Sequence, residues 1–178
     1  KVHRREEKYF KHWPELPQAE FLAPPGYESI YRTNAITRHG EHGNALLSRW
    51  PVVSHRHEDI SDHRFEQRGL LHVEVQVGDS AAQQDGVDES VTVHVIVVHL
   101  GLIPASRVRQ VEQLHKYIAR EVPPDAALLV AGDFNDWGKR LSRMMRDKGL
   151  CEWHSGVQPT YPSRLPMVQL DHVYARGL

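Results

Sequence analysis

The sequence VTVHVIVVHL, residues 91–100, decides the fold of this chain. Residues 91–98 are β-branched and almost continuously apolar, which predicts a central strand that is covered on both faces and leads to His99. Pro104 then begins a segment whose apolar side chains recur at steps of three and four residues, as in a helix with one buried face. A second buried strand, predicted over residues 126–131, completes a strand–helix–strand unit.

The flanking segments add further strands and a second helix. Residues 45–49 form a short apolar run, and residues 71–77 alternate apolar and polar side chains, as a strand with one face in the core does. Asp136 can cap a further helix that Gly149 ends, and residues 168–174 are predicted to form a last strand. Because strands and helices are interleaved with hairpin-like pairs, the pattern predicts an α/β or α+β sandwich with mixed sheets.

Length and composition set limits on organisation and function. The 178 residues fit a single domain, in which residues 1–42 lack a sustained period and are expected to be irregular. Acidic and basic residues number 23 and 22, so the net charge exerts no pull toward nucleic acid or an anionic membrane. The lone cysteine, Cys151, excludes an internal disulfide and slightly favours a reducing compartment such as the cytoplasm. No apolar run is long enough to cross a bilayer, and the charged first residues do not resemble a secretory signal.

Polar residues follow both central strands at the point where each strand ends. His99 follows the first strand, and Gly132-Asp133-Phe134-Asn135 follows the second. If the backbone stays extended, Asp133 and Asn135 point the same way while Phe134 points into the core. A carboxylate that orients or deprotonates water, beside an amide that donates to a phosphate oxygen, suits phosphoryl chemistry.

At this point the sequence resembles the endonuclease/exonuclease/phosphatase family, which includes pancreatic-type deoxyribonucleases, abasic-site endonucleases, neutral sphingomyelinases and inositol polyphosphate phosphatases. The resemblance spans residues 43–178, the family core, and rests on four motifs in the family's order: Gly43-Asn44-Ala45-Leu46-Leu47-Ser48-Arg49, His99-Leu100-Gly101-Leu102 with Arg109-Gln110, Gly132-Asp133-Phe134-Asn135-Asp136, and Gln169-Leu170-Asp171-His172. It implies a four-layer sandwich of two central mixed sheets flanked by helices, here incomplete at both termini.

The resemblance also implies a metal-dependent phosphoesterase, with Mg²⁺ as the cofactor and Mn²⁺ as a possible substitute. Asp133 matches the residue that activates or positions the attacking water, and Asn135 matches a neighbouring phosphate ligand; both can approach the metal. His99 matches a position that contacts the scissile phosphate or aids the leaving group. Asp171 matches the acid that orients a catalytic histidine.

The implied substrate is a phosphate ester of a nucleic acid, a nucleotide or a lipid head group. Arg68, Asn44 and Tyr161 are the expected substrate-binding residues, and no protein partner is predicted. An equal alternative for Tyr161 is that it belongs to a proline-rich surface loop and has no role in substrate binding. Arg109 lies on the predicted helix, where an arginine is more often ion-paired or solvated than a substrate ligand.

Two family motifs have no counterpart within the 178 residues. The Gln-Glu pair whose glutamate binds magnesium is expected upstream of residue 1, and the Ser-Asp-His motif with the general-base histidine is expected after Leu178. The chain as given is therefore expected to bind Mg²⁺ weakly and to turn over poorly.

Other interpretations of the same residues remain open. Asp133 and Asn135 could form only a turn and helix cap, His99 could bond to backbone, and Asp171 could pair with Arg164 or Arg176. At the level of function, the alternative is a degenerate domain that keeps the fold as a binding module. A third hypothesis, a histidine-rich metal-handling protein, rests on five scattered histidines: His39, His42, His55, His57 and His63.

Overall fold

The larger of two sheets carries His99, Asp133 and Asp171 at the ends of its strands. A computed structural model describes residues 2–5, 16–38, 40–78, 90–138, 140–154 and 156–178. Its six-stranded sheet has the order β4-β5-β6-β7-β9-β8. The strands are β4 (Val52–Asp59), β5 (Gly69–Val77), β6 (Val91–His99), β7 (Ala127–Asp133), β9 (Asp171–Arg176) and β8 (Cys151–Glu152). The sheet is mixed, because β6 and β7 pair in parallel while the other neighbours are antiparallel.

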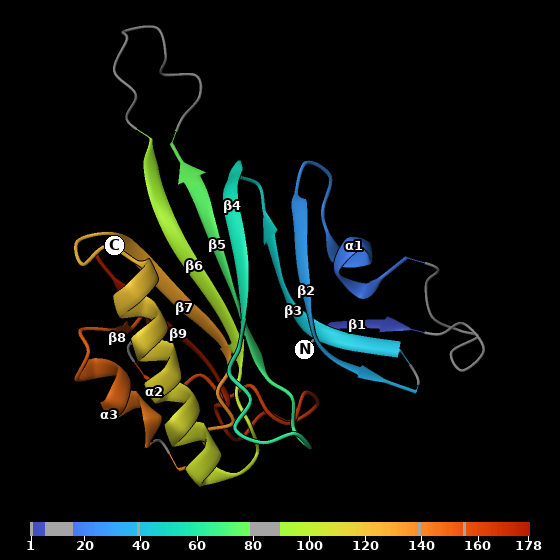
Figure 1. The fold of residues 1–178 in the computed structure, drawn as a ribbon, viewed down its shortest axis with the longest axis vertical. Helices are drawn as coiled ribbons and strands as arrows, with labels where there is room; N and C mark the ends of the chain where they lie inside the picture. The colour runs from blue at the N-terminus through green and yellow to red at the C-terminus, as the bar shows by residue number, and fades with distance from the viewer. Residues whose placement is uncertain (1, 6–15, 39, 79–89, 139, 155) are drawn as a thin grey trace, which may run out of the picture.

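The second sheet and the helices complete a layered sandwich (Figure 1). The second sheet has the order β1-β3-β2 and is antiparallel, with β1 (Val2–Arg5), β3 (Gly40–Ser48) and β2 (Glu28–Thr37). Figure 1 shows α2 (Pro104–Glu121) and α3 (Leu141–Arg146) against the large sheet, and α1 (Gln18–Leu22) beyond the small sheet. The expected α/β sandwich built on two sheets is confirmed.

The alternation of side chains along the central strands gives each face of the large sheet its own core. One set packs under α2 and α3, and its members on the sheet are Leu70, Ile96, Val98, Leu128, Val130 and Tyr174. The neighbouring positions face the small sheet, and this set includes Leu71, Val73, Val93, Val95 and Ala127 with Ile30 of β2. Strand β6 is therefore covered on both sides, as its continuous apolar sequence predicts.

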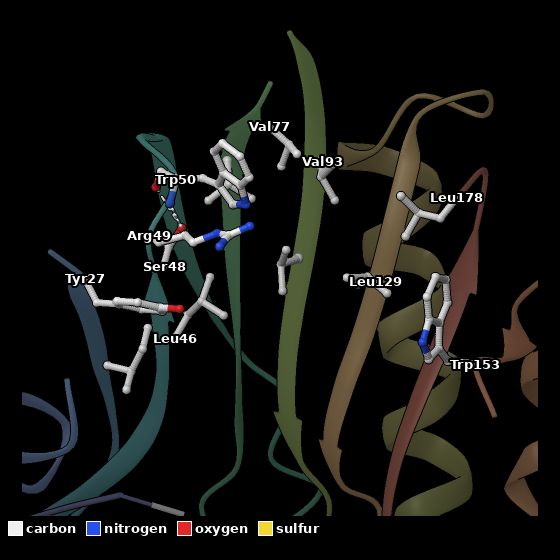
Figure 2. Close-up of a pocket in the computed structure, with 13 residues that line it drawn as sticks. Tyr27, Leu46, Ser48, Arg49, Trp50, Val77, Val93, Leu129, Trp153 and Leu178 are labelled. Carbon is white, nitrogen blue, oxygen red and sulfur yellow. Dashed lines mark hydrogen bonds between the residues drawn. The ribbon is translucent and has the colours of Figure 1, made fainter. Parts of the chain in front are cut away.

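The second core is open at one end of the sandwich. An apolar groove of about 470 Å³ lies between the sheets. Figure 2 shows its lining side chains, with Trp50 and Trp153 on opposite sides. Leu46 of β3 and Leu129 of β7 line it from the two sheets. These side chains are only partly buried, so the inter-sheet layer is less well packed than the layer under α2.

Several elements differ from the sequence prediction. The interpretation of residues 1–42 as irregular was wrong for Glu28–Thr37, because this ten-residue strand pairs with β3 along most of its length. β4 was missed because its polar side chains hide the strand period. The last strand was placed too early, since it begins at Asp171. Residues 78–90 have the polar composition of a connection between two strands, and most of them lie outside the described residues.

The helices agree with the prediction. α2 begins at Pro104, and α3 is followed by Gly149, whose φ of 76° is the left-handed conformation that glycine adopts after a helix. None of the described helices combines the length and the apolar character that a membrane span requires.

Candidate active site

Three of the predicted site residues lie side by side at one end of the large sheet. The parallel register of β6 and β7 pairs His99 with Asp133, and the antiparallel register of β7 and β9 pairs Asp133 with Asp171. His99 Nε2 lies 3.7 Å from Asp133 Oδ2. The backbone closes the same end, because Leu100 N–H donates to the Asp133 carbonyl at 2.8 Å. The structure thus brings Asp133 next to His99, which precedes it by 34 positions in the chain, and next to Asp171, which follows it by 38.

A tight approach of β6 and β7 sets the position of Asp133. Gly132 has φ 141°, and a Cβ at this residue would lie 1.9 Å from the Val98 carbonyl oxygen. Only glycine fits both that dihedral and that contact. Phe134, which follows Asp133, is fully buried and packs edge-on against Tyr174 with ring centroids 5.2 Å apart. The carboxylate therefore stands between a glycine-dependent strand contact and an aromatic anchor.

The backbone does not stay extended to Asn135, which corrects the geometry expected from the sequence. Asn135 has φ 49°, in the left-handed region, and its side chain is buried. Its amide Nδ2 donates to the Leu100 carbonyl at 2.8 Å, and its backbone N–H donates to Asp133 Oδ1 at 2.9 Å. Asn135 thus joins the loop after β6 to the loop after β7 and also holds the Asp133 carboxylate in place.

Asp136 caps the following segment. Its Oδ1 accepts from Arg140 N–H at 3.1 Å, and its Oδ2 accepts from Leu141 N–H, the first residue of α3, at 2.8 Å. The N-cap residue of α3 is Arg140 rather than Asp136, but the buried Asp136 carboxylate accepts the two N–H groups at the start of the helix, which is the capping interaction expected of it in another position. Asp133 and Asp136 therefore have different tasks although three positions separate them.

The surroundings of Asp133 favour its protonated form. Burial raises the pKa of its carboxyl group, and the neighbouring negative charge of Asp171 raises it further. The Asn135 N–H and the Arg68 guanidinium act in the opposite direction. Asp171 is exposed, so the pair faces solvent on one side. Within the described residues Asp171 forms no ion pair with Arg164 or Arg176, the partners that the plainer interpretation offered.

Arg68 lies immediately before β5 and is bound to a glutamate that the sequence reasoning missed. Its Nη2 donates to Glu66 Oε1 at 2.9 Å, and the same oxygen accepts from Leu102 N–H at 3.0 Å. Arg68 Nε is buried and has no hydrogen-bond partner within the part of the chain described. Glu66 therefore ties Arg68 to the loop after His99. The sequence signal, an acid two positions before the arginine, was too common to single out.

Asn44 and Tyr161 occupy contrasting environments. Asn44 is buried on β3, and its Nδ2 donates to the carbonyls of Gly69 at 2.7 Å and Val97 at 3.0 Å. It therefore braces the small sheet against the large one. Tyr161 is half-exposed and packs edge-on against Trp137, with centroids 5.5 Å apart. Trp137, itself about half-exposed, was missed in the sequence although it directly follows Asp136.

A cleft of about 560 Å³ lies beside this end of the sheet. Its walls are the first turns of α2 and, from the segment that follows Asp133, the residues Asp136, Trp137, Gly138, Arg140 and Leu141. Arg107 lines it but is directed at backbone, since its Nη1 donates to the carbonyls of Gly101 and Leu102. Trp137 forms part of the lining, so the cleft is continuous with the exposed aromatic pair.

Two other interpretations from the sequence can be compared with the structure. Arg109 is ion-paired, with Nε and Nη2 directed at the Asp62 carboxylate at 2.5 and 2.6 Å, as the plainer alternative proposed. The histidines behind the metal-handling hypothesis form no metal-binding cluster among the residues described; His39 lies outside them. His55 and His57 instead hydrogen-bond to Arg32 and Asn34 of β2.

Comparisons with known proteins agree with this architecture. The model of the endonuclease/exonuclease/phosphatase family matches residues 9–178. The uncharacterized protein YbhP of Escherichia coli K12 is 31% identical in an alignment over 175 residues that covers 95% of this chain and 65% of that protein. YbhP of Shigella flexneri matches to the same extent. The chain thus spans slightly under two thirds of the length of these curated relatives.

Solved structures share the fold at low sequence identity. The mannosyl-6-phosphatase of Bacteroides thetaiotaomicron has a TM-score of 0.62 and 17% identity, over 85% of this chain and 63% of that one. An endonuclease/exonuclease/phosphatase protein of Beutenbergia cavernae has 0.63 and 21%, over 97% and 53%. ANGEL2, a 2′,3′-cyclic phosphatase, has 0.64 and 13%, over 97% and 68%. These likenesses show the fold, and the match of the family model over residues 9–178 shows that the chain belongs to the endonuclease/exonuclease/phosphatase family.

Proposed function

We propose that the intact protein is a divalent-metal-dependent hydrolase of phosphate esters whose catalytic residues include His99, Asp133, Asn135 and Asp171. The observation that carries the proposal is the approach of His99 Nε2 to Asp133 Oδ2, 3.7 Å apart, where two parallel strands end together. An imidazole nitrogen and a carboxylate oxygen at this spacing can both contact one water molecule or one phosphoryl oxygen that lies beside them. Family membership supports the reaction class.

In the proposed reaction a water molecule attacks phosphorus in line with the leaving group. Asp133 orients the water and accepts its proton, a role that suits a carboxyl group whose pKa is raised by burial. His99 donates a hydrogen bond to the phosphoryl or leaving-group oxygen. Asn135 holds Asp133 Oδ1 through its backbone N–H, so that Oδ2 is the oxygen left to act on water.

The donor set suits a hard cation. Asp133, Asn135 and Asp171 supply oxygen ligands, and Mg²⁺ in proteins is often held by one or two carboxylates plus waters and substrate phosphates. We propose that Asp133 and Asn135 contact Mg²⁺, or Mn²⁺ in its place. The metal would supply charge stabilisation on the phosphoryl oxygens. The described residues offer no group of three acidic or histidine ligands at this end of the sheet, so further ligands must come from water, substrate or the rest of the protein.

For substrate binding we propose Arg68, Asn44 and Tyr161 at successive distances from the reacting phosphate. Arg68 Nε is the buried donor left without a protein partner, and it adds positive potential beside Asp133. Asn44 fixes the strand ends beneath the phosphate through its two backbone contacts. Tyr161 and Trp137 offer exposed rings for the organic part of the substrate. Nucleic acids, nucleotides, lipid head groups and sugar phosphates all meet these requirements.

The proposal is tested on the intact gene product with Asp133→Asn and the matched variant Asp147→Asn, which changes an exposed aspartate beyond the end of α3. Mg²⁺- or Mn²⁺-dependent hydrolysis of a generic phosphodiester or monoester is expected for the wild type and for Asp147→Asn. Asp133→Asn is expected to lose about 10²–10⁴-fold in kcat, the usual contribution of a general base. Equal rates for Asp133→Asn and the wild type would refute this role. Substrate binding without metal-dependent turnover would instead favour the binding module.

A further inference from the structure

A second group of polar side chains lies under α2, away from the candidate active site. Its members are His72 and Glu74 of β5 and His94 of β6. Positions 72 and 74 alternate on one strand and so share a face, and the register pairs Glu74 with His94 on the neighbouring strand. His94 precedes His99 by five residues on β6, which corresponds to about 16 Å along an extended strand.

The geometry of this cluster is that of metal ligands. One potential ligand atom from each of the three residues lies within 4.8 Å of the other two. His72 Nε2 and His94 Nδ1 are 3.0 Å apart, close to the roughly 3.3 Å between two nitrogens on a tetrahedral zinc ion with bonds of about 2.0–2.1 Å. Two imidazoles with a carboxylate are a ligand set that zinc sites use.

The surroundings orient the first histidine for such a role. His72 Nδ1 lies 3.0 Å from the Tyr117 hydroxyl, which can accept its N–H and leave Nε2 with the lone pair directed at the cluster. A ligating histidine normally makes such a second contact through its other ring nitrogen. Arg56 approaches Glu74 at 3.5 Å and engages one of its oxygens.

We propose that His72, Glu74 and His94 form a binding site for a late divalent transition metal, of which Zn²⁺ is the best fit. The ion would join β5 to β6 beneath the C-terminal half of α2, where the Tyr117 hydroxyl holds His72 in place. This position suits a structural role. The site is distinct from the Mg²⁺ contacts proposed for Asp133 and Asn135, because its two nitrogen ligands select a softer ion than an all-oxygen site does. The inference stands independently of the proposed phosphoesterase activity.

The test measures zinc binding to the intact, metal-stripped protein in excess Mg²⁺. Calorimetry gives the affinity and stoichiometry, and the absorption bands of Co²⁺, used in place of Zn²⁺, report the coordination geometry. The variants are Glu74→Gln and His94→Gln, with Tyr117→Phe for the orienting contact. His57→Gln is the matched control, because His57 lies on β4 and bonds to Asn34. Circular dichroism and urea unfolding of each apo variant report whether it folds.

The wild type and His57→Gln are expected to bind one equivalent of Zn²⁺ with the same affinity and to give tetrahedral Co²⁺ spectra. Removing an outer contact typically costs about 10–100-fold in metal affinity, and this range is expected for Tyr117→Phe. Glu74→Gln and His94→Gln remove a ligand and are expected to lose more than about 100-fold. X-ray absorption on the zinc-loaded wild type is expected to count two imidazoles, a measurement that does not depend on the variants.

The proposal is overturned if His94→Gln binds zinc as the wild type does, or if absorption spectroscopy counts no imidazole at the bound zinc. It is also overturned if the wild type takes up no zinc. In those cases the Tyr117–His72–His94 contacts are a hydrogen-bonded chain within the core. Hydrolysis of phosphate esters is not among the readouts, so failure of this site leaves the proposed function untouched.

Discussion

Replacement of Gly132 by alanine tests the argument that close packing of β6 against β7 positions Asp133. The added Cβ would lie 1.9 Å from the Val98 carbonyl oxygen, about 1.4 Å closer than the roughly 3.3 Å of a close C···O contact. The clash is with backbone, so the two strands must separate or the peptide must rotate. The residue must in addition hold φ 141°, a conformation that costs an L residue about 1–3 kcal/mol.

The expected loss in free energy of unfolding is the sum of these effects. The dihedral alone accounts for about 1–3 kcal/mol, and weakening one or two interstrand hydrogen bonds adds about 1–2 kcal/mol. Gly149→Ala is the matched control, because Gly149 also has positive φ but its Cβ would meet nothing within 4 Å. That variant is expected to lose only about 1–2 kcal/mol. The two expected losses, about 2–5 and about 1–2 kcal/mol, are centred about 2 kcal/mol apart, so Gly132→Ala is expected to be less stable than Gly149→Ala by about that amount.

Urea unfolding followed by circular dichroism measures both variants, and a common m-value licenses the comparison of midpoints. Hydrolysis by the intact protein is a second readout, since separation of β6 and β7 moves Asp133 away from His99. Equal stability of the two variants would refute the reasoning, because it would mean that the strands tolerate the added methyl group without moving. A loss of stability with unchanged turnover would refute the link between the strand contact and the site.

Three further predictions concern neighbouring residues. Hydrogen bonds, principally from Arg109, hold the pKa of Asp62 well below its usual range, so Asp62→Asn should cost stability at neutral pH. Since that contribution exists above the unfolded-state pKa of about 3.9, the difference from wild type should shrink as pH falls below about 4. Asn135→Ala should be less stable than Asn135→Gly by about 1 kcal/mol, because both lose the amide while only alanine is strained at φ 49°. Tyr161→Ala should raise KM with little change in kcat, because its ring is half-exposed and contacts only Trp137 among the aromatic rings described.

Each of these has a distinct opposing result. An Asp62→Asn penalty that stays constant from pH 7 to about pH 3 would mean that the carboxylate is not linked to folding through its proton. If Asn135→Gly and Asn135→Ala were equally stable, the left-handed backbone would carry no strain. An unchanged KM for Tyr161→Ala would remove the tyrosine from the substrate site and leave it as a loop residue.

The parts of the fold that were predictable from sequence are those where one physical signal dominates. Residues 91–98 could hardly be other than a covered strand, because eight nearly continuous apolar and β-branched residues have few other stable environments. Pro104 and Gly149 marked helix limits through backbone constraints that do not depend on tertiary context. The small sheet was harder to predict from sequence, since β2 carries polar residues such as Arg32 and Asn34 whose hydrogen-bond partners lie on β4.

The candidate site likewise has parts that could be predicted from sequence and parts that could not. His99 and Asp133 could be placed together from sequence because parallel strands joined by a helix end at the same edge. The left-handed turn at Asn135 could not, since it depends on a buried amide finding the Leu100 carbonyl 35 residues away. Glu66 and His72 could not be identified from the sequence for a related reason, because the contact that makes each of them notable is with a partner that is brought near only by the tertiary fold.

The parallel pairing of β6 with β7 has a kinetic consequence. His99 and Asp133 meet only after the chain between them has closed a long loop and α2 has docked, and such non-local pairing is intrinsically slow. Helical signal is expected to return early during refolding, while His99 and Asp133 are still apart. Under the proposed function, hydrolysis should therefore recover later than ellipticity, and agents that trap early collapsed species should yield molecules with native-like helix content and no turnover.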